Sequence, residues 1–416
     1  MNGIAHLGNG KVIENSAIGF RNGKLDLVAD ATTIKLQQGA YDTTINISGK
    51  QVYPGFIAPN STLGLSEMDA VRASNDFSET GIYNPHVRSI IAYNSDSKIP
   101  PTVRTNGVLL AQITPRGGVI SGTSSVIELD GWNWEDMAMK TDEGIHLNWL
   151  HMFKPESEKN SDANEVPPLK KNEDYEKQKN DLKKFFADAK AYSEVGPEEK
   201  NLRFEAMKGL FADPTKGTDS VFQRSTKTLY IHVNYVKEIE DAVSFAKTAG
   251  VKKTLIVGGT DSWMVTDLLK QNNVGVMVNR LHELPKNSDD DIDLPYKLPA
   301  LLQKAGVLFC LENAGDMEAS HARNIPFLAG TAAAYGLTKE EALGAVTLNT
   351  AKILGIDNRV GSLETGKDAT LFISSGDALD MRTNNVEWAF IRGKKLDLSN
   401  EQKGLYEKYV KKYGLK

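Results

Sequence analysis

Residues 228–259 read TLYIHVNYVKEIEDAVSFAKTAGVKKTLIVGG, and they show most clearly which elements the chain is built from. Its two ends, Thr228–Val233 and Thr254–Val257, are rich in β-branched and apolar residues, as buried strands are. Between them apolar residues recur at helical spacing, and Gly250 stands where a glycine commonly ends a helix. The stretch therefore predicts a strand, a helix and a second strand.

The same alternation continues as far as residue 311. Val274–Val278 and Val307–Leu311 are further apolar runs, and Leu298–Lys304 between them has a helical pattern. Strands that do not alternate polar and apolar residues, separated by amphipathic helices, imply a parallel sheet covered on both faces. The number of such units suits a barrel or a doubly wound sheet. Cys310 lies in one of these runs and is expected to be a small core residue.

The two ends of the chain have a different pattern. Asn9-Gly10 and Asn22-Gly23 are hairpin signals, and Lys24–Val28 and Thr44–Ile47 alternate polar and apolar residues as strands do. Near the C-terminus, Arg392–Lys394 predicts another hairpin. Strands at both ends of one long α/β region predict that the termini meet in a small β-domain.

Composition excludes several classes of protein. The 416 residues carry 49 basic and 54 acidic side chains, a formal net charge of −5, which gives no reason to expect nucleic-acid binding. No apolar stretch approaches the roughly 20 residues of a membrane helix, so no membrane span is expected. The single cysteine excludes an internal disulfide and a cysteine metal cluster. The sequence shows no signal peptide, and two compartments stay open: the cytoplasm, or export with a signal peptide that is absent from this sequence.

Four segments resemble the amidohydrolase superfamily. Val52–Ile57 (VYPGFI) resembles the segment that enters the first barrel strand, and Gly361–Leu371 (GSLETGKDATL) resembles the C-terminal signature. Asn349–Gly355 matches the helix before that signature, and Pro115–Gly122 is similar to the imidazolonepropionase-like branch. The resemblance spans the chain and implies an α/β fold: a TIM-like (β/α)8 barrel with a small composite β-sandwich domain formed by both chain ends.

The expected domain boundaries follow from this resemblance. Residues 1–55 and 356–400 are expected to form the composite β-sandwich domain, and residues 56–355 the barrel. A charged, helical insertion at about 155–225 is expected to be either a solvated decoration or a lid over the barrel mouth. Residues 401–416 are expected to form a C-terminal helix.

The metal ligands of the superfamily are poorly matched. There the first strand normally ends Asp-x-His-x-His, with both histidines on the metal, whereas Asn60 and Thr62 occupy these positions here. Zinc prefers imidazole, thiolate or carboxylate ligands. His232 matches the histidine that ends the fifth strand, but the sixth-strand histidine has become Gly258 or Gly259. The resemblance therefore predicts no cofactor, and leaves open a single divalent metal such as zinc at His232.

Several side chains are candidates for the active site, each with two interpretations. His232 is either a ligand or general base at the barrel mouth, or an inherited histidine without a role. The family's last-strand aspartate has no clear equivalent: Glu312 and Asn313 are nearest in register, and Asp316 follows within one turn. Glu312 and Asp316 are either acid–base groups or loop carboxylates. Arg116 stands beside two glycines, and it either binds a carboxylate or phosphate group of a ligand or forms an ion pair within the protein. The candidate catalytic residues are His232, Glu312 and Asp316; the candidate substrate-binding residues are Asn60, Thr62, Arg104 and Arg116.

Two functions follow from these observations. The first is hydrolysis of C–N bonds in cyclic amides or similar small substrates, with a weakened or absent metal site. The second is a binding or scaffold subunit of the same fold without catalytic activity, because a fold does not fix a function. The expected partner is a small-molecule substrate or ligand, and both a homodimer and pairing with a paralogue stay open.

Overall fold

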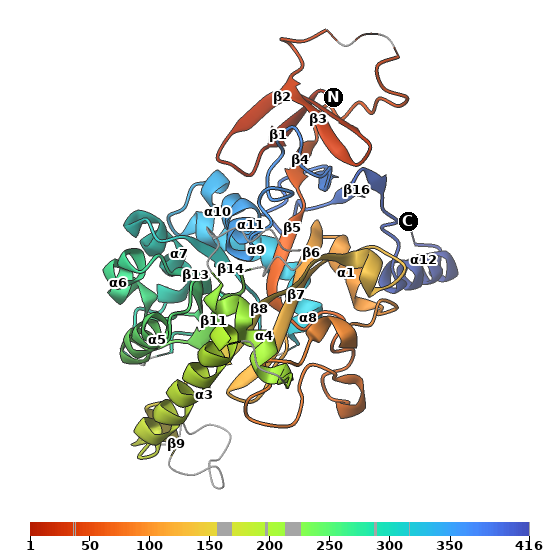
Figure 1. Ribbon diagram of the computed structural model, residues 1–416. Helices are drawn as coiled ribbons and strands as arrows, with labels where there is room; N and C mark the ends of the chain where they lie inside the picture. Colours follow the sequence, from red (N-terminus) through yellow and green to blue (C-terminus); the bar gives the residue numbers. More distant parts are fainter. Residues whose placement is uncertain are drawn as a thin grey trace.

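The structure is a computed structural model that describes residues 1–35, 37, 39–155, 169–195, 199–212, 226–286, 289–315 and 317–415. It contains a barrel and a separate sheet built from both ends of the chain, which lies above the barrel in Figure 1. A large hydrophobic core fills the barrel and continues onto strands of the second sheet, and a smaller core lies against that sheet alone.

The barrel is an eight-stranded sheet. Its strands, in spatial order, are β14 (Phe309–Leu311), β13 (Gly275–Val278), β12 (Thr254–Gly258), β11 (Thr228–Val233), β8 (Ala138–Asn148), β7 (Ile120–Glu128), β6 (Val108–Ile113) and β5 (Phe56–Ser61). No strand pairing joins β5 to β14 among the described residues, so the barrel is nearly closed. The expected TIM-like barrel is confirmed, and the strands predicted in residues 228–311 are present.

One strand departs from the all-parallel pattern. β7 is antiparallel to both β6 and β8, whereas the other neighbouring pairs are parallel. Residues 114–119 alone connect β6 to β7. A parallel connection needs a dozen or more residues, so this short link dictates a hairpin. As a result, the first residues of β7 lie at the same end of the barrel as the last residues of β6.

A buried tyrosine fills the barrel beside a glycine. Tyr230 on β11 has no exposed surface, and a Cβ atom placed on Gly144 of β8 would lie 2.2 Å from the ring. Any side chain at position 144 would therefore displace the ring. The glycine lets two neighbouring strands accommodate a large side chain in a core that is packed as densely as a crystal.

The second sheet has seven strands. Their order is β17 (Lys394–Lys395), β16 (Val386–Ile391), β15 (Leu371–Ser374), β4 (Gln51–Pro54), β1 (Gly3–His6), β2 (Val12–Arg21) and β3 (Lys24–Asp30). β4 and β15 pair directly, so the two ends of the chain meet as expected. Gly55 alone separates β4 from β5, so the chain passes from this sheet straight into the barrel.

The turns follow the sequence signals closely. Asn22 and Gly23 join β2 to β3, and both have positive φ angles, 52° and 79°, as this kind of tight hairpin requires. One strand prediction is wrong: Thr44–Ile47 is not a strand. Ile47 is buried, but its backbone N–H donates to Met1 at the chain end and no continuous ladder forms.

Twelve α-helices occur in the described residues. They are α1 (Ile99–Arg104), α2 (Trp134–Met137), α3 (Tyr175–Val195), α4 (Leu202–Phe211), α5 (Val236–Ala249), α6 (Thr266–Gln271), α7 (Leu294–Ala305), α8 (Glu318–His321), α9 (Ile325–Ala334), α10 (Lys339–Ala345), α11 (Leu348–Leu354) and α12 (Glu401–Tyr413). Gly250 ends α5 in the left-handed conformation, as the sequence predicted. The carboxylate of Asp261 accepts from the backbone N–H of Val236, at the start of the same helix.

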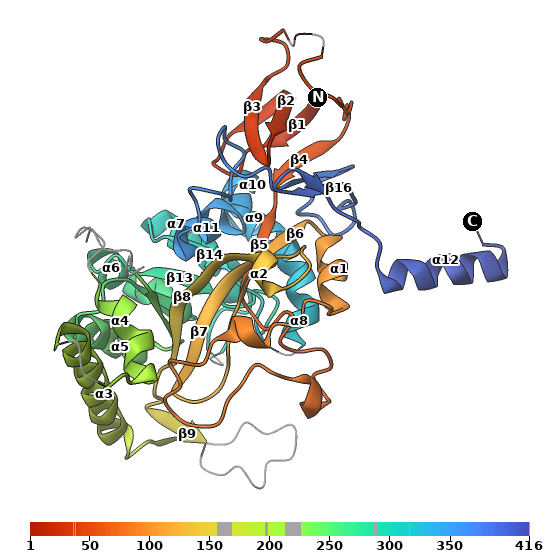
Figure 2. The same ribbon diagram turned by 45° about the vertical axis from the view of Figure 1, so that its right-hand side comes forward.

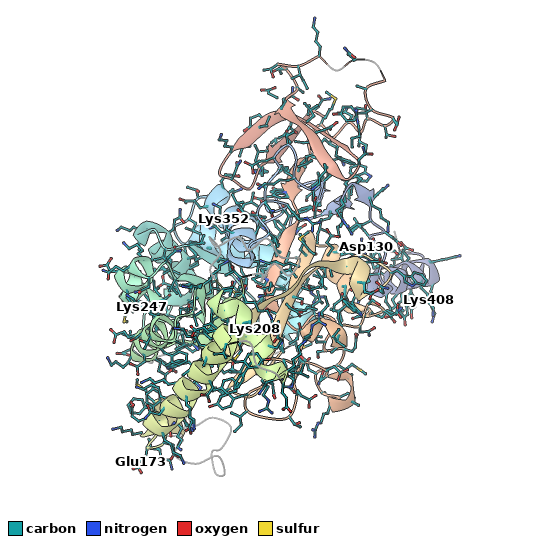
Figure 3. The ribbon with its side chains drawn as sticks, in the orientation of Figure 1. Asp130, Glu173, Lys208, Lys247, Lys352 and Lys408 are labelled. Atoms are coloured by element: carbon teal, nitrogen blue, oxygen red, sulfur yellow. The ribbon has the colours of Figure 1, made fainter. Side chains whose placement is uncertain are left out.

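The helices outside the barrel wall differ in how they are packed. Within the insertion expected at 155–225, residues 156–168, 196–198 and 213–225 lie outside the described residues; α3 and α4 pack against each other, and α3 also contacts α5. α12 extends away from the rest of the molecule and buries none of its residues (Figure 2). Lys247 on α5 and Lys408 on α12 lie at the periphery (Figure 3). Among the described residues, no helix is long and apolar enough to cross a bilayer.

Candidate active site

Polar side chains gather where the parallel strands of the barrel end. Six of them, here called the mouth cluster, come from four strand ends, the link between β6 and β7, and the start of α8. They are Asn60, Arg116, His146, His232, Glu312 and Glu318. This end of a barrel is where enzymes with this fold place their active sites.

Asn60 has an unusual backbone conformation. Its φ angle is +50°, and the pairing of β5 with β6 is irregular between Ala58 and Ser61. Asparagine tolerates this left-handed conformation better than most residues with a side chain. Its backbone N–H donates to the Gln112 side chain at 3.0 Å, and its carbonyl accepts from Arg116 at 2.8 Å. Side chains thus replace the strand partners that the irregularity removes.

Arg116 is held in place by its own loop. Its backbone N–H donates to the carbonyl of Phe77 at 2.6 Å. The two residues that follow, Gly117 and Gly118, both have positive φ angles. A Cβ atom on Gly118 would lie 2.9 Å from two carbonyl oxygens of the neighbouring loop, so only glycine fits there. This close approach fixes the point from which the arginine side chain enters the mouth.

The Arg116 guanidinium binds groups from two sides of the mouth. One terminal nitrogen donates to Oδ1 of Asn60 at 3.0 Å. The other donates to the Asn60 carbonyl and to a carboxylate oxygen of Glu318, which is 3.1 Å away. Glu318 also accepts from the backbone N–H of Gly315 at 3.0 Å. The cation is therefore both hydrogen-bonded and ion-paired.

Two histidines from neighbouring strands form a pair. Nδ1 of His146 and Nε2 of His232 lie 2.9 Å apart, so one ring donates to the other. Burial, and then the nearby Arg116 charge, lower the pKa of His232 to about 3. Burial, followed by the neighbouring His232 ring and Arg116, lowers the pKa of His146 well below its usual range. Both rings are therefore neutral at physiological pH, and part of the His232 surface stays accessible to solvent.

Glu312 is the buried acid of the mouth cluster. It follows β14 directly and is 1% exposed. One carboxylate oxygen accepts from the backbone N–H of Ala314 at 2.7 Å and from the Asn60 amide at 3.2 Å. Burial raises the pKa of Glu312 to about 7, although these hydrogen bonds and Arg116 act in the opposite direction. The acid can therefore change its protonation state near neutral pH.

A second layer of polar groups supports the mouth cluster from inside the barrel. Gln112, which accepts from the Asn60 backbone, donates to the carboxylate of Glu143 at 2.6 Å. Glu143 also accepts from the hydroxyls of Ser124 at 2.5 Å and Tyr230 at 2.7 Å. The Tyr230 ring in turn stacks on the ring of His146. These contacts fix the orientation of side chains at the mouth.

The structure brings together four of the residues singled out from sequence: Asn60, Arg116, His232 and Glu312. Thr62 lies beside them, buried, and lines a surface hollow of about 380 Å³ together with Glu318. Asp316 lies outside the described residues.

Arg104 is the exception among the expected substrate-binding residues, because it is not at the mouth. It ends α1, just before β6 begins, and so lies at the opposite end of the barrel. There its guanidinium donates to Asp130 at 2.6 Å.

The sequence analysis did not single out His146 or Glu318. A signal for His146 does exist, since Ile145-His146-Leu147 repeats the apolar–histidine–apolar pattern of residues 231–233 at a neighbouring strand end. Glu318 has no comparable signal, because its ion pair with Arg116 joins residues 202 positions apart.

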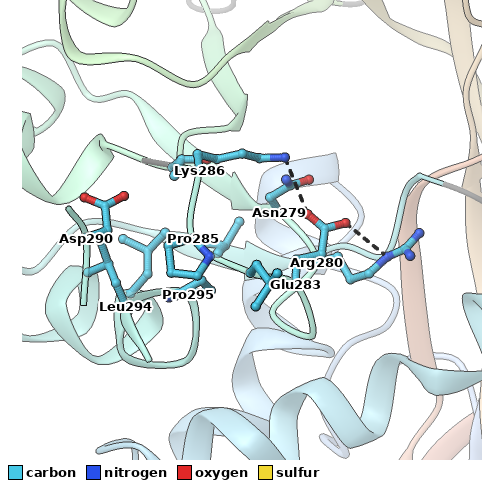
Figure 4. A pocket seen from close by; sticks show the side chains of 12 residues that line it. Asn279, Arg280, Glu283, Pro285, Lys286, Asp290, Leu294 and Pro295 are labelled. Carbon is cyan, nitrogen blue, oxygen red and sulfur yellow. Dashed lines mark ion pairs between the residues drawn. The ribbon is translucent and has the colours of Figure 1, made fainter. Parts of the chain in front are cut away.

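A second hollow near the mouth is too small for a substrate. It lies by the ends of β12 and β13, and Figure 4 shows Glu283 between Arg280 and Lys286, with 3.6 Å to each cation. Its volume of about 20 Å³ is room for one water molecule.

Known proteins support this description of the fold. Residues 227–396 match the sequence profile of the amidohydrolase family. This part of the chain is therefore similar to the amidohydrolase family. The matched residues include His232 and Glu312, so the resemblance inferred from short motifs is confirmed for this part of the chain.

Solved amidohydrolase-fold structures superpose on nearly the whole chain. An amidohydrolase from Thermotoga maritima MSB8 has a TM-score of 0.76 at 23% identity, over 95% of this chain and 98% of that one. Molinate hydrolase has a TM-score of 0.54 at 12% identity, over 95% and 94%. An adenosine deaminase from Xanthomonas campestris, with bound zinc, has a TM-score of 0.51 at 14% identity, over 98% and 96%. At these identities the likeness shows the fold alone.

A short match also links the chain to a curated amidohydrolase. Imidazolonepropionase from Shewanella frigidimarina (strain NCIMB 400) is 63% identical over 35 residues, which is 8% of this chain and 8% of that protein. The chain therefore matches only a small part of this relative's length. The family and the structural neighbours together support a hydrolase.

Proposed function

We propose that this chain hydrolyses C–N bonds in cyclic amides or similar small substrates at the mouth cluster, with a metal site that is weakened or absent. The observation that carries the proposal is Glu312, a buried acid with a pKa of about 7 beside the Arg116 cation. An acid whose pKa lies near the working pH is suited to general acid–base catalysis.

The chemistry assigned to these groups is water addition across an amide. Glu312, when ionised, takes a proton from water as the oxygen attacks the amide carbonyl. Negative charge then develops on the carbonyl oxygen, and the Arg116 guanidinium stabilises it. Glu312 returns its proton to the leaving nitrogen as the C–N bond breaks. His232 stays neutral and serves as a hydrogen-bonding partner for the substrate.

One experiment tests this proposal directly. Purified protein is assayed for amine or ring-opened product on a panel of cyclic amides and dipeptides. Glu312→Gln is expected to lower kcat by about a hundredfold or more, the usual scale for a lost acid–base group. The matched control is Glu283→Gln, at the same end of the barrel but outside the mouth cluster, which should leave turnover unchanged. Equal activity in both variants would contradict the assignment.

A second candidate function is ligand binding without turnover. The observation in its favour is that both terminal nitrogens of Arg116 already donate to Asn60 and Glu318, which leaves the cation neutralised by the protein. Thermal stabilisation by members of the same panel, with no product formed from any of them, would favour this function over hydrolysis.

A further inference from the structure

We infer that the Arg116 guanidinium takes the place of the divalent metal cation at the centre of the mouth cluster. The inference deepens the proposed function and rests on it, because it takes the mouth cluster to be the active site. Its test is metal binding, which can be measured whether or not the protein turns over a substrate.

The position of Arg116 is the first argument. The guanidinium binds both Oδ1 and the carbonyl of Asn60, the residue at the first histidine position of the β5 motif. The side-chain amide of the same Asn60 donates to Glu312, at the end of the last strand, at 3.2 Å. The guanidinium also pairs with Glu318 at 3.1 Å. One fixed cation thus lies among groups from the strand ends that would surround a metal.

The available donors are the second argument. Zinc sites are built from imidazole, thiolate or carboxylate groups. At β5, Asn60 has its amide oxygen committed to Arg116, and Thr62 offers only a hydroxyl. The sixth strand ends in Gly258, which has no side chain. The two histidines direct one nitrogen each at the other ring. This set does not fit a zinc ion while Arg116 is present.

Charge is the third argument. The cluster holds one permanent cation, Arg116, and two carboxyl groups, Glu312 and Glu318. With both carboxylates ionised, a divalent ion added beside Arg116 would leave the cluster with one positive charge in a buried place. Without Arg116 the same ion would be neutralised. The arginine therefore repels a metal, and removing its charge should admit one.

The experiment compares three arginine variants with the wild type. Arg116→Gln removes the charge, Arg116→Lys keeps it, and Arg104→Gln removes an ion-paired arginine at the far end of the barrel. Each protein is titrated with Co²⁺ by visible absorption and with Zn²⁺ by calorimetry, after circular dichroism has established its folding. The wild type, Arg116→Lys and Arg104→Gln should show no metal binding that depends on His232. Arg116→Gln should gain affinity by about tenfold or more, and His232→Ala in that background should remove the gain.

Two results would overturn the inference. The first is stoichiometric zinc or cobalt in the wild type that is lost in His232→Ala, a comparison that needs no arginine variant to fold. The second is an Arg116→Gln affinity no greater than that of Arg116→Lys. Failure of the proposed function gives a different result. If Arg116→Gln gains metal affinity but the wild type turns over no substrate, only the proposed hydrolase activity is contradicted. If the wild type turns over substrate with zinc bound, only the inference about Arg116 is contradicted.

Discussion

Replacing Glu312 with glutamine should change how stability depends on pH. Burial raises the pKa of this carboxyl from 4.5 to about 7, so the folded protein holds the proton more tightly than the unfolded chain. The stabilisation from this proton is complete below pH 4.5 and is lost as pH rises through 7. Each tenfold difference in proton affinity is worth about 1.4 kcal/mol, so ionising Glu312 costs about 3 kcal/mol of unfolding free energy above pH 8.

Urea unfolding of the wild type and Glu312→Gln, each at pH 5 and pH 8.5, measures this cost. The wild type should lose about 2.5 kcal/mol more than the variant between the two pH values, because a small part of the cost is already present at pH 5. Glu364→Gln is the matched control, because hydrogen bonds lower the pKa of Glu364 to about 2 and it stays ionised across this range. It should therefore follow the wild type. Identical pH dependence in the wild type and Glu312→Gln would refute the reasoning.

Three further predictions concern single residues. Gly144→Ala should lower unfolding free energy by about 2 kcal/mol, because the new Cβ meets the Tyr230 ring; an unchanged melting temperature would contradict this. Asn60→Gly should be more stable than Asn60→Ala by about 1 kcal/mol in chemical denaturation, because both lose the amide but only glycine suits a φ of +50°. Arg116→Gln should raise the pKa of His232 above about 3, as followed by NMR of the imidazole Cε1–H resonance, and no change would show that the guanidinium does not act on that ring.

Much of the fold could be predicted because it depends on local patterns. The β11 strand, the glycine that ends α5 and the Asn22-Gly23 hairpin each follow from the residues in the element itself. The sequence analysis predicted no direction for β7, because the glycines of residues 115–122 indicate a family resemblance and not a strand direction. The length of the link was the better physical signal, since so few residues cannot make a parallel crossover.

The candidate site was less predictable, because its contacts join distant parts of the chain. His232 and Glu312 follow recognisable strands, so their place at the mouth could be expected. The Arg116–Glu318 ion pair depends on how the link between β6 and β7 approaches the start of α8, which no local pattern in the sequence indicates. Arg104 was expected to bind substrate, but it precedes β6, and a residue before a parallel strand lies at the opposite end of the barrel from a residue after it.

Turnover of a cyclic amide as a function of pH, by protein dialysed against a chelator, tests the central claim most directly. We expect activity that survives the chelator, rises with pH through about 7 as Glu312 ionises, and is lost in Glu312→Gln. Activity that disappears on chelation and returns with zinc, or that keeps its pH profile in Glu312→Gln, would contradict the account.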